Sequence, residues 1–119
     1  SDPGIIKYMN EKFYAVKMNA ETSDTIIFRD TTYMNKGISF RSPNEIAVKL
    51  LKGRMGYPSM VILDEKLNNI ELIQSYLPAE HLKVYLEYYG ENTYKTMKWD
   101  AYVQKIENEM NQKKPEPMR

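Results

Sequence analysis

Two apolar runs joined by a polar bend constrain the fold of this chain more than any other stretch. The first run, "SMVILD", follows a Tyr57-Pro58 step, and the second, "IELIQS", comes after the bend "EKLNN". Short β-branched runs on either side of such a bend are typical of an antiparallel hairpin. Proline has no amide hydrogen and a fixed φ, so it suits the first residue or the edge of a strand. The sequence therefore predicts a hairpin whose first strand begins at Pro58.

Four stretches have the patterns of helices. The first, "SDPGIIKYMNEKF", can be capped by Ser1 or Asp2. The second, "SPNEIAVKLLKG", offers Ser42 as cap, Pro43 as the first helical residue, Glu45 to complete a capping box and Gly53 at its end. The third, "LPAEHLKVYLEYYG", has apolar residues at helical spacing between a proline and Gly90. The fourth begins at about Thr96.

The remaining stretches predict a strand and a second hairpin. "FYAVKMNA", residues 13–20, mixes aromatic and β-branched residues and indicates a buried strand. "TIIF" and "TYMN" around the turn-prone "RDT" indicate a small hairpin within residues 21–41. Helices that alternate with strands imply a mixed sheet with helices on its faces. We expect one domain over residues 1–110 and a frayed tail over residues 111–119.

Composition excludes several classes of function. Lys and Arg number 17 against 16 Asp and Glu, so the net charge of +1 gives no long-range attraction to nucleic acid. No apolar stretch approaches the roughly 18 residues of a membrane span, so no span is expected. The absence of cysteine excludes a disulfide, a thiolate nucleophile and a cysteine metal site within these residues.

No residue stands out as catalytic, and no metal or cofactor site is indicated. His81 lies beside the apolar stripe of its helix and lacks an evident partner, so we interpret it as a solvated helix residue. Ser42 and Ser59 lack a nucleophile-elbow context. The acidic residues have no calcium-loop spacing, and the glycines form no phosphate-binding motif. The late aromatic residues favour packing over a peptide-binding patch.

The segment "MGYPSMVILDEKLNNIELIQSYLPAEHLKVYL" resembles the second half of a thioredoxin-like domain of the bacterial thioredoxin or thiol–disulfide isomerase type. In that family a helix and a loop lead to a cis-proline, a strand pair and a final helix. "SDPGIIKYMNEKFYAVKMNAE" is similar to the stretch that follows the family's catalytic motif. The resemblance implies an α/β, thioredoxin-like three-layer sandwich that is truncated, with helices on both faces of a mixed sheet. Residues 96–110 would be an extra C-terminal helix, and residues 21–41 an insertion.

The resemblance also implies a binding site and a missing part. Gly56, Tyr57 and Pro58 would form one wall of a groove for an extended protein substrate, with the proline cis. The family's Cys-X-X-Cys segment and central strand would lie outside this chain. Without that strand the segments at residues 13–18 and 59–63 each lose a neighbour. The strand could belong to a longer form of the protein, which we favour, or to another copy, or the two segments could pair directly.

Two functions follow as expectations. The first is a thioredoxin-like domain of a thiol–disulfide oxidoreductase whose dithiol lies outside the chain. The alternative is a redox-inactive module that holds a protein partner by strand addition; a purely structural domain is a third. The resemblance implies a protein or peptide substrate, no cofactor and a periplasmic or cell-envelope location. An open sheet edge or strand exchange would allow a homo-oligomer.

Overall fold

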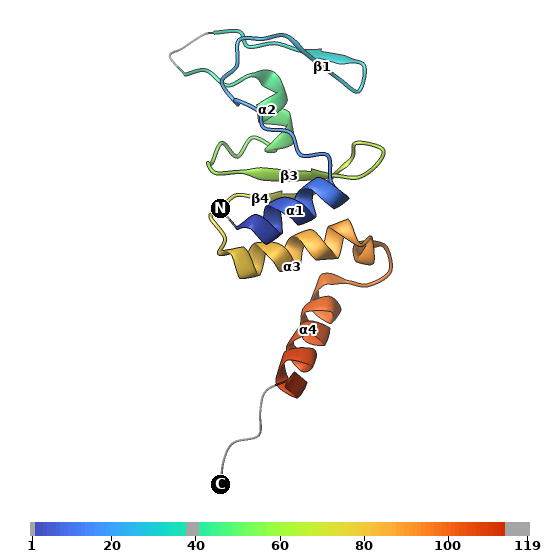
Figure 1. Ribbon diagram of the computed structural model, residues 1–119. Helices are drawn as coiled ribbons and strands as arrows, with labels where there is room; N and C mark the ends of the chain where they lie inside the picture. Colours follow the sequence, from blue (N-terminus) through green and yellow to red (C-terminus); the bar gives the residue numbers. More distant parts are fainter. Residues whose placement is uncertain (1, 38–40, 114–119) are drawn as a thin grey trace. The chain divides into compact units, whose positions relative to one another are not determined.

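The computed structural model describes residues 2–37 and 41–113 (Figure 1). This part of the chain is mixed α and β, and its elements are α1 (Pro3–Lys12), β1 (Ile26–Phe28), β2 (Thr31–Tyr33), α2 (Glu45–Leu50), β3 (Met60–Leu63), β4 (Asn69–Ile73), α3 (Ala79–Gly90), a 3-10 turn (Thr93–Lys95) and α4 (Trp99–Lys113). Two compact units share the chain: a terminal unit, Ser1–Ala15 with Leu77–Arg119, and a central unit, Val16–Tyr76.

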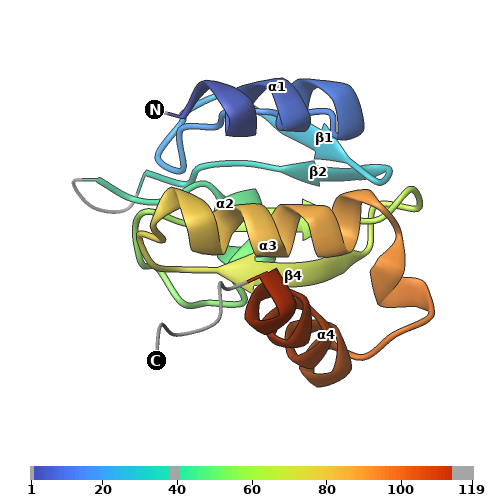
Figure 2. The same cartoon turned by 60° about the horizontal axis from the view of Figure 1, so that its bottom comes forward.

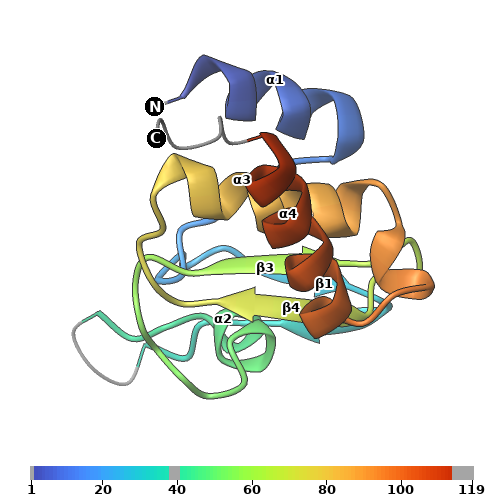
Figure 3. The same ribbon diagram turned by 90° about the horizontal axis from the view of Figure 1, so that it is seen from below.

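In the terminal unit, α1 and α3 lie side by side (Figure 3). The predicted first helix is confirmed, with Asp2 as its N-cap: Oδ1 accepts hydrogen bonds from the amides of Gly4 at 2.8 Å and Ile5 at 3.2 Å. At the other end, the Tyr8 hydroxyl donates to Glu91 Oε2 at 2.6 Å. Both ends of the chain therefore contribute to this unit.

Gly90 is needed for close approach and does not end its helix in the way the sequence suggested. It is the last residue of α3, and the left-handed residue beyond the helix is Asn92, with φ 60°. A Cβ at position 90 would lie 2.8 Å from the Tyr8 hydroxyl oxygen and 3.1 Å from the Phe13 ring. Hydrogen at this position lets α1 pack against the end of α3.

Helix α4 follows α3 and lies against it (Figure 2). A cluster of aromatic side chains joins the two helices. Trp99 stacks on Tyr85 with ring centroids 4.4 Å apart, and Tyr88 contacts Tyr102 at 4.9 Å. The buried Tyr88 also donates its hydroxyl to the Met97 carbonyl at 2.6 Å. The prediction that the late aromatic residues pack between helices is confirmed.

The predicted last helix exists as well, and α4 continues to Lys113, beyond the point where a frayed tail was predicted. Residues 114–119 of that tail lie outside the described residues.

The central unit begins with the small predicted hairpin, which is confirmed. β1 and β2 are antiparallel, with Ile26 opposite Tyr33. Arg29 and Asp30 have φ values of 52° and 62°. Two successive positive φ angles match the twist of a type I′ hairpin turn. Residues 38–40 of the predicted insertion lie outside the described residues.

Helix α2 begins two residues later than its sequence suggested. The N-cap is Asn44, whose Oδ1 accepts from the Ile46 amide at 3.1 Å, and not Ser42. Asn44 is fully buried, and its Nδ2 donates to the carbonyls of Thr22 at 3.2 Å and Asp24 at 2.9 Å. The asparagine amide accepts one hydrogen bond and donates two, so it satisfies three backbone groups at once. A serine hydroxyl has one hydrogen and can donate only one. The cap therefore also fixes the loop before β1.

The end of α2 is a Schellman motif with an unusual residue in it. The Gly53 amide donates to the Val48 carbonyl at 2.8 Å, and the Lys52 amide to the Lys49 carbonyl at 3.1 Å. These are the two bonds that define the motif. The left-handed position after the cap belongs to Lys52, with φ 55°, and Gly53 follows at φ 78°. The predicted glycine is thus one residue beyond the position that most needs it.

The second predicted hairpin is also confirmed. β3 and β4 are antiparallel, with Met60 opposite Ile73 and a bulge between Ile62 and Leu63. Asp64 closes the bend: its Oδ1 accepts from the amides of Lys66 at 2.9 Å and Asn68 at 2.8 Å. Hydrogen bonds from Asn68 are the main reason that the pKa of Asp64 lies below its ordinary value.

The predicted buried strand at residues 13–20 is wrong. Residues 13–19 belong to no strand, and Tyr14 and Val16 are exposed by 103% and 87%. Within the described residues the sheets are two separate antiparallel pairs, β1–β2 and β3–β4. A strand needs a partner for its amides and carbonyls, and no described strand pairs with this segment. The parallel strand of the expected mixed sheet is therefore absent here.

Candidate functional site

The candidate site is the loop between α2 and β3, where Gly56, Tyr57 and Pro58 follow one another. Tyr57 is 56% exposed and Pro58 is exposed, whereas Gly56 is half-buried. The peptide bond between Tyr57 and Pro58 is cis, as the resemblance implies. The loop therefore presents an aromatic ring and a proline ring to solvent directly before β3.

Gln74, at the end of β4, fastens this loop to the hairpin. Its Nε2 donates to the Arg54 carbonyl and, at 3.2 Å, to Ser59 Oγ. Ser59 in turn donates its hydroxyl to the Gly56 carbonyl. The Gly56 amide donates to the Arg54 carbonyl at 2.9 Å. These four bonds satisfy polar groups on both sides of Tyr57. They hold the loop against the hairpin, and the tyrosine side chain stays accessible.

The strand that follows the loop pairs with another strand on one side only. β3 pairs with β4, and no other strand of the described residues lies beside it. An edge strand keeps half of its amides and carbonyls directed away from its partner. The loop and β3 together thus place an aromatic–proline step at the end of a row of backbone donors and acceptors. Such a row can pair with an extended polypeptide.

Groups for covalent or metal chemistry are missing from this site. The chain has no cysteine. Among residues 2–37 and 41–113, no three His, Cys, Asp or Glu side chains lie close enough together to hold a metal ion. His81 is exposed on α3 in the terminal unit, which confirms its interpretation as a solvated helix residue.

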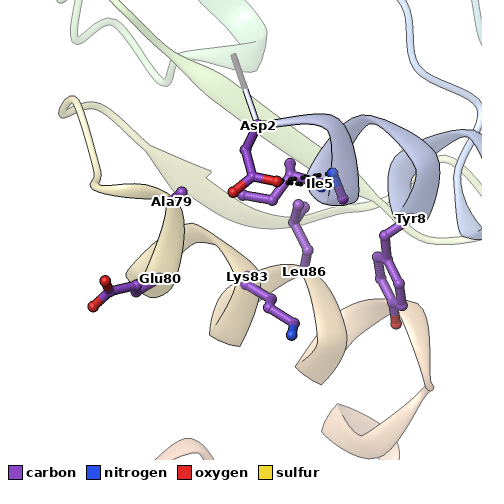
Figure 4. Close-up of a pocket in the computed structure, with 8 residues that line it drawn as sticks. Asp2, Ile5, Tyr8, Ala79, Glu80, Lys83 and Leu86 are labelled. Atoms are coloured by element: carbon purple, nitrogen blue, oxygen red, sulfur yellow. Dashed lines mark hydrogen bonds between the residues drawn. The ribbon is translucent and has the colours of Figure 1, made fainter.

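A separate pocket of about 240 Å³ lies in the terminal unit (Figure 4). Ile5 and the buried Leu86 supply apolar lining between α1 and α3. Asp2 lines the pocket too, but its Oδ1 is engaged by its own helix (dashed lines). Glu80 points away from the other labelled side chains. The polar lining residues Tyr8 and Lys83 are paired with Glu91 and Glu87, so they also have partners within the unit.

One electrostatic coupling in the terminal unit links Tyr8 to Glu91. Burial raises the pKa of Tyr8 well above its ordinary value, and its hydrogen bond to Glu91 adds to the rise. The same bond lowers the pKa of Glu91, with help from Lys12, whose Nζ lies 3.6 Å from Glu91 Oε2. Together these three side chains join α1 to the end of α3, and they do not form a binding site.

Sequence reasoning identified the loop but missed its support. The structure brings Gly56, Tyr57 and Pro58 together, as their adjacency requires. Gln74 was not singled out, although it lies opposite the loop in the antiparallel hairpin. A polar residue just beyond the apolar run "IELI" was the available signal, because register places the end of β4 beside the start of β3.

Comparisons with known proteins identify no relative of this chain. No protein-family model matches it, and no curated protein or solved structure shows a significant match. None of the helices in the described part of the chain is both long enough and apolar enough to cross a lipid bilayer.

Proposed function

We propose that this chain is the polypeptide-binding part of a thioredoxin-like domain. The 56–58 loop and the open edge of β3 hold an extended segment of a protein. The observation that carries the proposal is an exposed aromatic–proline step at the start of an edge strand. Main-chain pairing along β3 supplies affinity, and contact with the Tyr57 ring orients the guest.

The order of elements supports the thioredoxin-like assignment. α2, the loop with its cis-proline, the antiparallel pair β3–β4 and then α3 follow one another as the resemblance implies. In an oxidoreductase of this kind a thiolate attacks a substrate disulfide and forms a mixed disulfide. A dithiol segment outside this chain would supply that thiolate, and the residues here would bind the substrate.

A redox-inactive binding module is the second candidate. The observation that favours it is the absence of cysteine in the chain. The intact mass and thiol content of the natural gene product separate the two. A product with two reactive thiols that reduces insulin supports the oxidoreductase. A cysteine-free product rules it out and leaves the binding module.

Binding itself is tested with carboxymethylated lactalbumin, a permanently unfolded polypeptide without free thiols. Fluorescence anisotropy of the labelled polypeptide measures its affinity for the chain and for Tyr57→Ala. We expect the variant to bind about tenfold more weakly, since it loses the exposed aromatic anchor.

Tyr76→Ala is the matched control. Tyr76 is 85% exposed and lies beyond the end of β4. The control should bind like the parent chain. Equal affinity of Tyr57→Ala and the parent chain, or no binding by the parent chain, would contradict the proposed site.

A further inference from the structure

The candidate loop and the strand after it carry positive charge and no acidic residue. Between Lys49 and Leu63 the cationic residues are Lys49, Lys52 and Arg54, and there is no aspartate or glutamate. The whole chain has a net charge of only +1, so this excess of positive charge is local. All three side chains are exposed, and in the described part of the chain no ion pair or side-chain hydrogen bond engages them.

Helix geometry accounts for two of these cations but not for the third. Lys49 lies in the last turn of α2 and Lys52 just beyond its end, where a cation is favourable beside the helix C-terminus. Arg54 lies past the helix, next to the candidate loop. Its amide donates to the Leu51 carbonyl at 3.0 Å, and its carbonyl accepts from the Gly56 amide at 2.9 Å. The backbone of Arg54 is therefore fixed beside the loop while its side chain stays exposed.

A second arginine, Arg41, reaches the same loop from another part of the central unit. Hydrogen bonding to Glu21 is the main reason that the pKa of Arg41 lies above its ordinary value, and the charge of the nearby Tyr57 contributes to a smaller extent. Arg41 Nε donates to Glu21 Oε1 at 3.1 Å, and Nη2 lies 3.0 Å from the same oxygen. The Nη1 atom takes no part in these contacts. Arg41 therefore lies beside Tyr57 with one side of its guanidinium held by Glu21.

Glu21 is itself held in place, so it orients this arginine. The Glu21 amide donates to Asn19 Oδ1 at 3.0 Å, and its carbonyl accepts from Asn35 Nδ2 at 3.1 Å. A carboxylate on a fixed backbone sets the plane of the Arg41 guanidinium before any guest arrives, and such preorganisation lowers the cost of binding. The N–H groups that Glu21 leaves unused can donate to a second carboxylate.

We propose that the guest of the 56–58 loop is an acidic polypeptide whose carboxylate side chains bind Arg41 and Arg54 beside Tyr57. This inference rests on the proposed function, because it names the class of polypeptide that the loop and β3 hold. Charge complementarity of this kind selects among guests and speeds association more than it adds affinity. A nucleic acid suits the surface less well, because the cations are few and the backbone groups of β3 pair with a polypeptide.

Labelled peptides of about ten residues test the charge preference. They share one sequence rich in threonine and valine, and differ only at the positions that carry glutamate, glutamine or lysine. Fluorescence anisotropy at low salt should show that the glutamate peptide binds about threefold more tightly than the glutamine peptide, and the lysine peptide about threefold more weakly. Sodium chloride at about 0.5 M should remove these differences, because salt screens exposed charges. Equal affinities of the three peptides at low salt overturn the proposal.

Arg41→Gln and Arg54→Gln locate the preference. Each variant should bind the glutamate peptide about threefold more weakly and the glutamine peptide as the parent chain does, which also shows that the loop is still folded. Arg29→Gln is the matched control. It removes the same charge from an exposed arginine whose Nη1 donates to Asn68 Oδ1 at 3.2 Å, in the bend at the far end of β3. An equal loss in the control would mean that net charge alone acts, and overturns the proposal.

The outcome is separable from that of the proposed function. Tyr57→Ala should weaken the binding of all three peptides by the same factor, because contact with the ring does not depend on the charge of the guest. If it does so while the parent chain binds the three peptides equally, the loop holds polypeptides and only the acidic preference is wrong. If Tyr57→Ala leaves every affinity unchanged, both proposals fail. Oligothymidylate that binds more tightly than the glutamate peptide identifies a nucleic acid as the occupant and overturns the inference.

Discussion

At the scale of single residues, two positions show how backbone geometry and side-chain volume limit what the chain tolerates. Gly90 lies where α1 meets α3, and Lys52 holds a left-handed conformation that favours glycine. At each position the direction of the change in stability on substitution can be predicted. In both cases it is opposite to the change that helix propensity or sequence position alone would suggest.

Gly90→Ala should destabilise the protein, although alanine is ordinarily the better helix former by about 1 kcal/mol. The added Cβ would lie 2.8 Å from the Tyr8 hydroxyl oxygen, so we expect a net loss of about 1–2 kcal/mol in the free energy of unfolding. Urea denaturation followed by circular dichroism measures it. In a Tyr8→Phe background, which lacks that oxygen, the loss should be smaller; equal losses in the two backgrounds would contradict the contact.

Lys52→Gly should stabilise the protein by about 0.5–1 kcal/mol. The substitution removes the strain of a Cβ at φ 55°, which outweighs the extra freedom that glycine gives the unfolded chain. Lys49→Gly is the matched control. Lys49 lies inside α2, so its replacement by glycine should lower the free energy of unfolding by about 1 kcal/mol. Thermal denaturation of both variants checks the opposite signs. Destabilisation by both would mean that the left-handed position is not strained.

At the scale of elements, polar side chains determine how the helices join their neighbours. Asn44 connects α2 to the loop before β1, and Tyr8 connects α1 to the end of α3. Each interaction uses a side chain that is at least partly buried and has a specific partner. Their removal should therefore cost more than a typical surface substitution.

Asn44→Asp should destabilise the central unit by about 2–4 kcal/mol. Aspartate keeps the cap acceptor for the Ile46 amide but loses the Nδ2 donor, so a carboxylate would face the carbonyls of Thr22 and Asp24 in a buried site. Chemical denaturation gives the value. Asn10→Asp, on the exposed side of α1, serves as control and should change stability by less than about 0.5 kcal/mol. A similar small effect at position 44 would show that its donors are dispensable.

Tyr8→Phe should change how stability depends on pH at both extremes. The lowered pKa of Glu91 stabilises the folded state above the ordinary value of 4.5, and this contribution is lost as the pH falls through the folded pKa. The raised pKa of Tyr8 stabilises the folded state below pH 10.0, and this contribution is lost at higher pH. The difference in unfolding free energy between parent and variant should be flat from about pH 5 to about pH 9 and shrink on either side. A difference that does not vary with pH would contradict the pairing.

At the scale of the whole molecule, the chain passes between its two units through the exposed residues 14–18. Proteases need an accessible backbone outside helices and strands, and this segment offers one at Lys17. In dilute solution, trypsin should cut after Lys17 much faster than after Lys49 in α2 or Lys83 in α3. Mass spectrometry of timed digests gives the order of cleavage. Earlier cleavage within either helix would show that residues 14–18 are protected.

Local signals predicted most of the elements but not the interactions between distant segments. The pattern around "RDT" and the Asp64 bend depend on neighbouring residues, and both hairpins form as predicted. The start of α2 was wrong because the donors of Asn44 find carbonyls some twenty residues away, which a local capping pattern does not reveal. Of the site, Tyr57 and Pro58 could be predicted from the sequence, whereas Gln74 required the register of the hairpin, which pairs Met60 with Ile73.

The sequence by itself determined where helices and hairpins form, because periodicity, caps and turn residues act over a few neighbouring positions. Tertiary structure decided whether a strand-like stretch becomes a strand and what a glycine is for. Residues 14–18 have the composition of a strand but lack a neighbour for their backbone groups, and Gly90 matters because Tyr8, far away in the sequence, packs against it. Both outcomes depend on which distant segments meet, and local composition does not encode that.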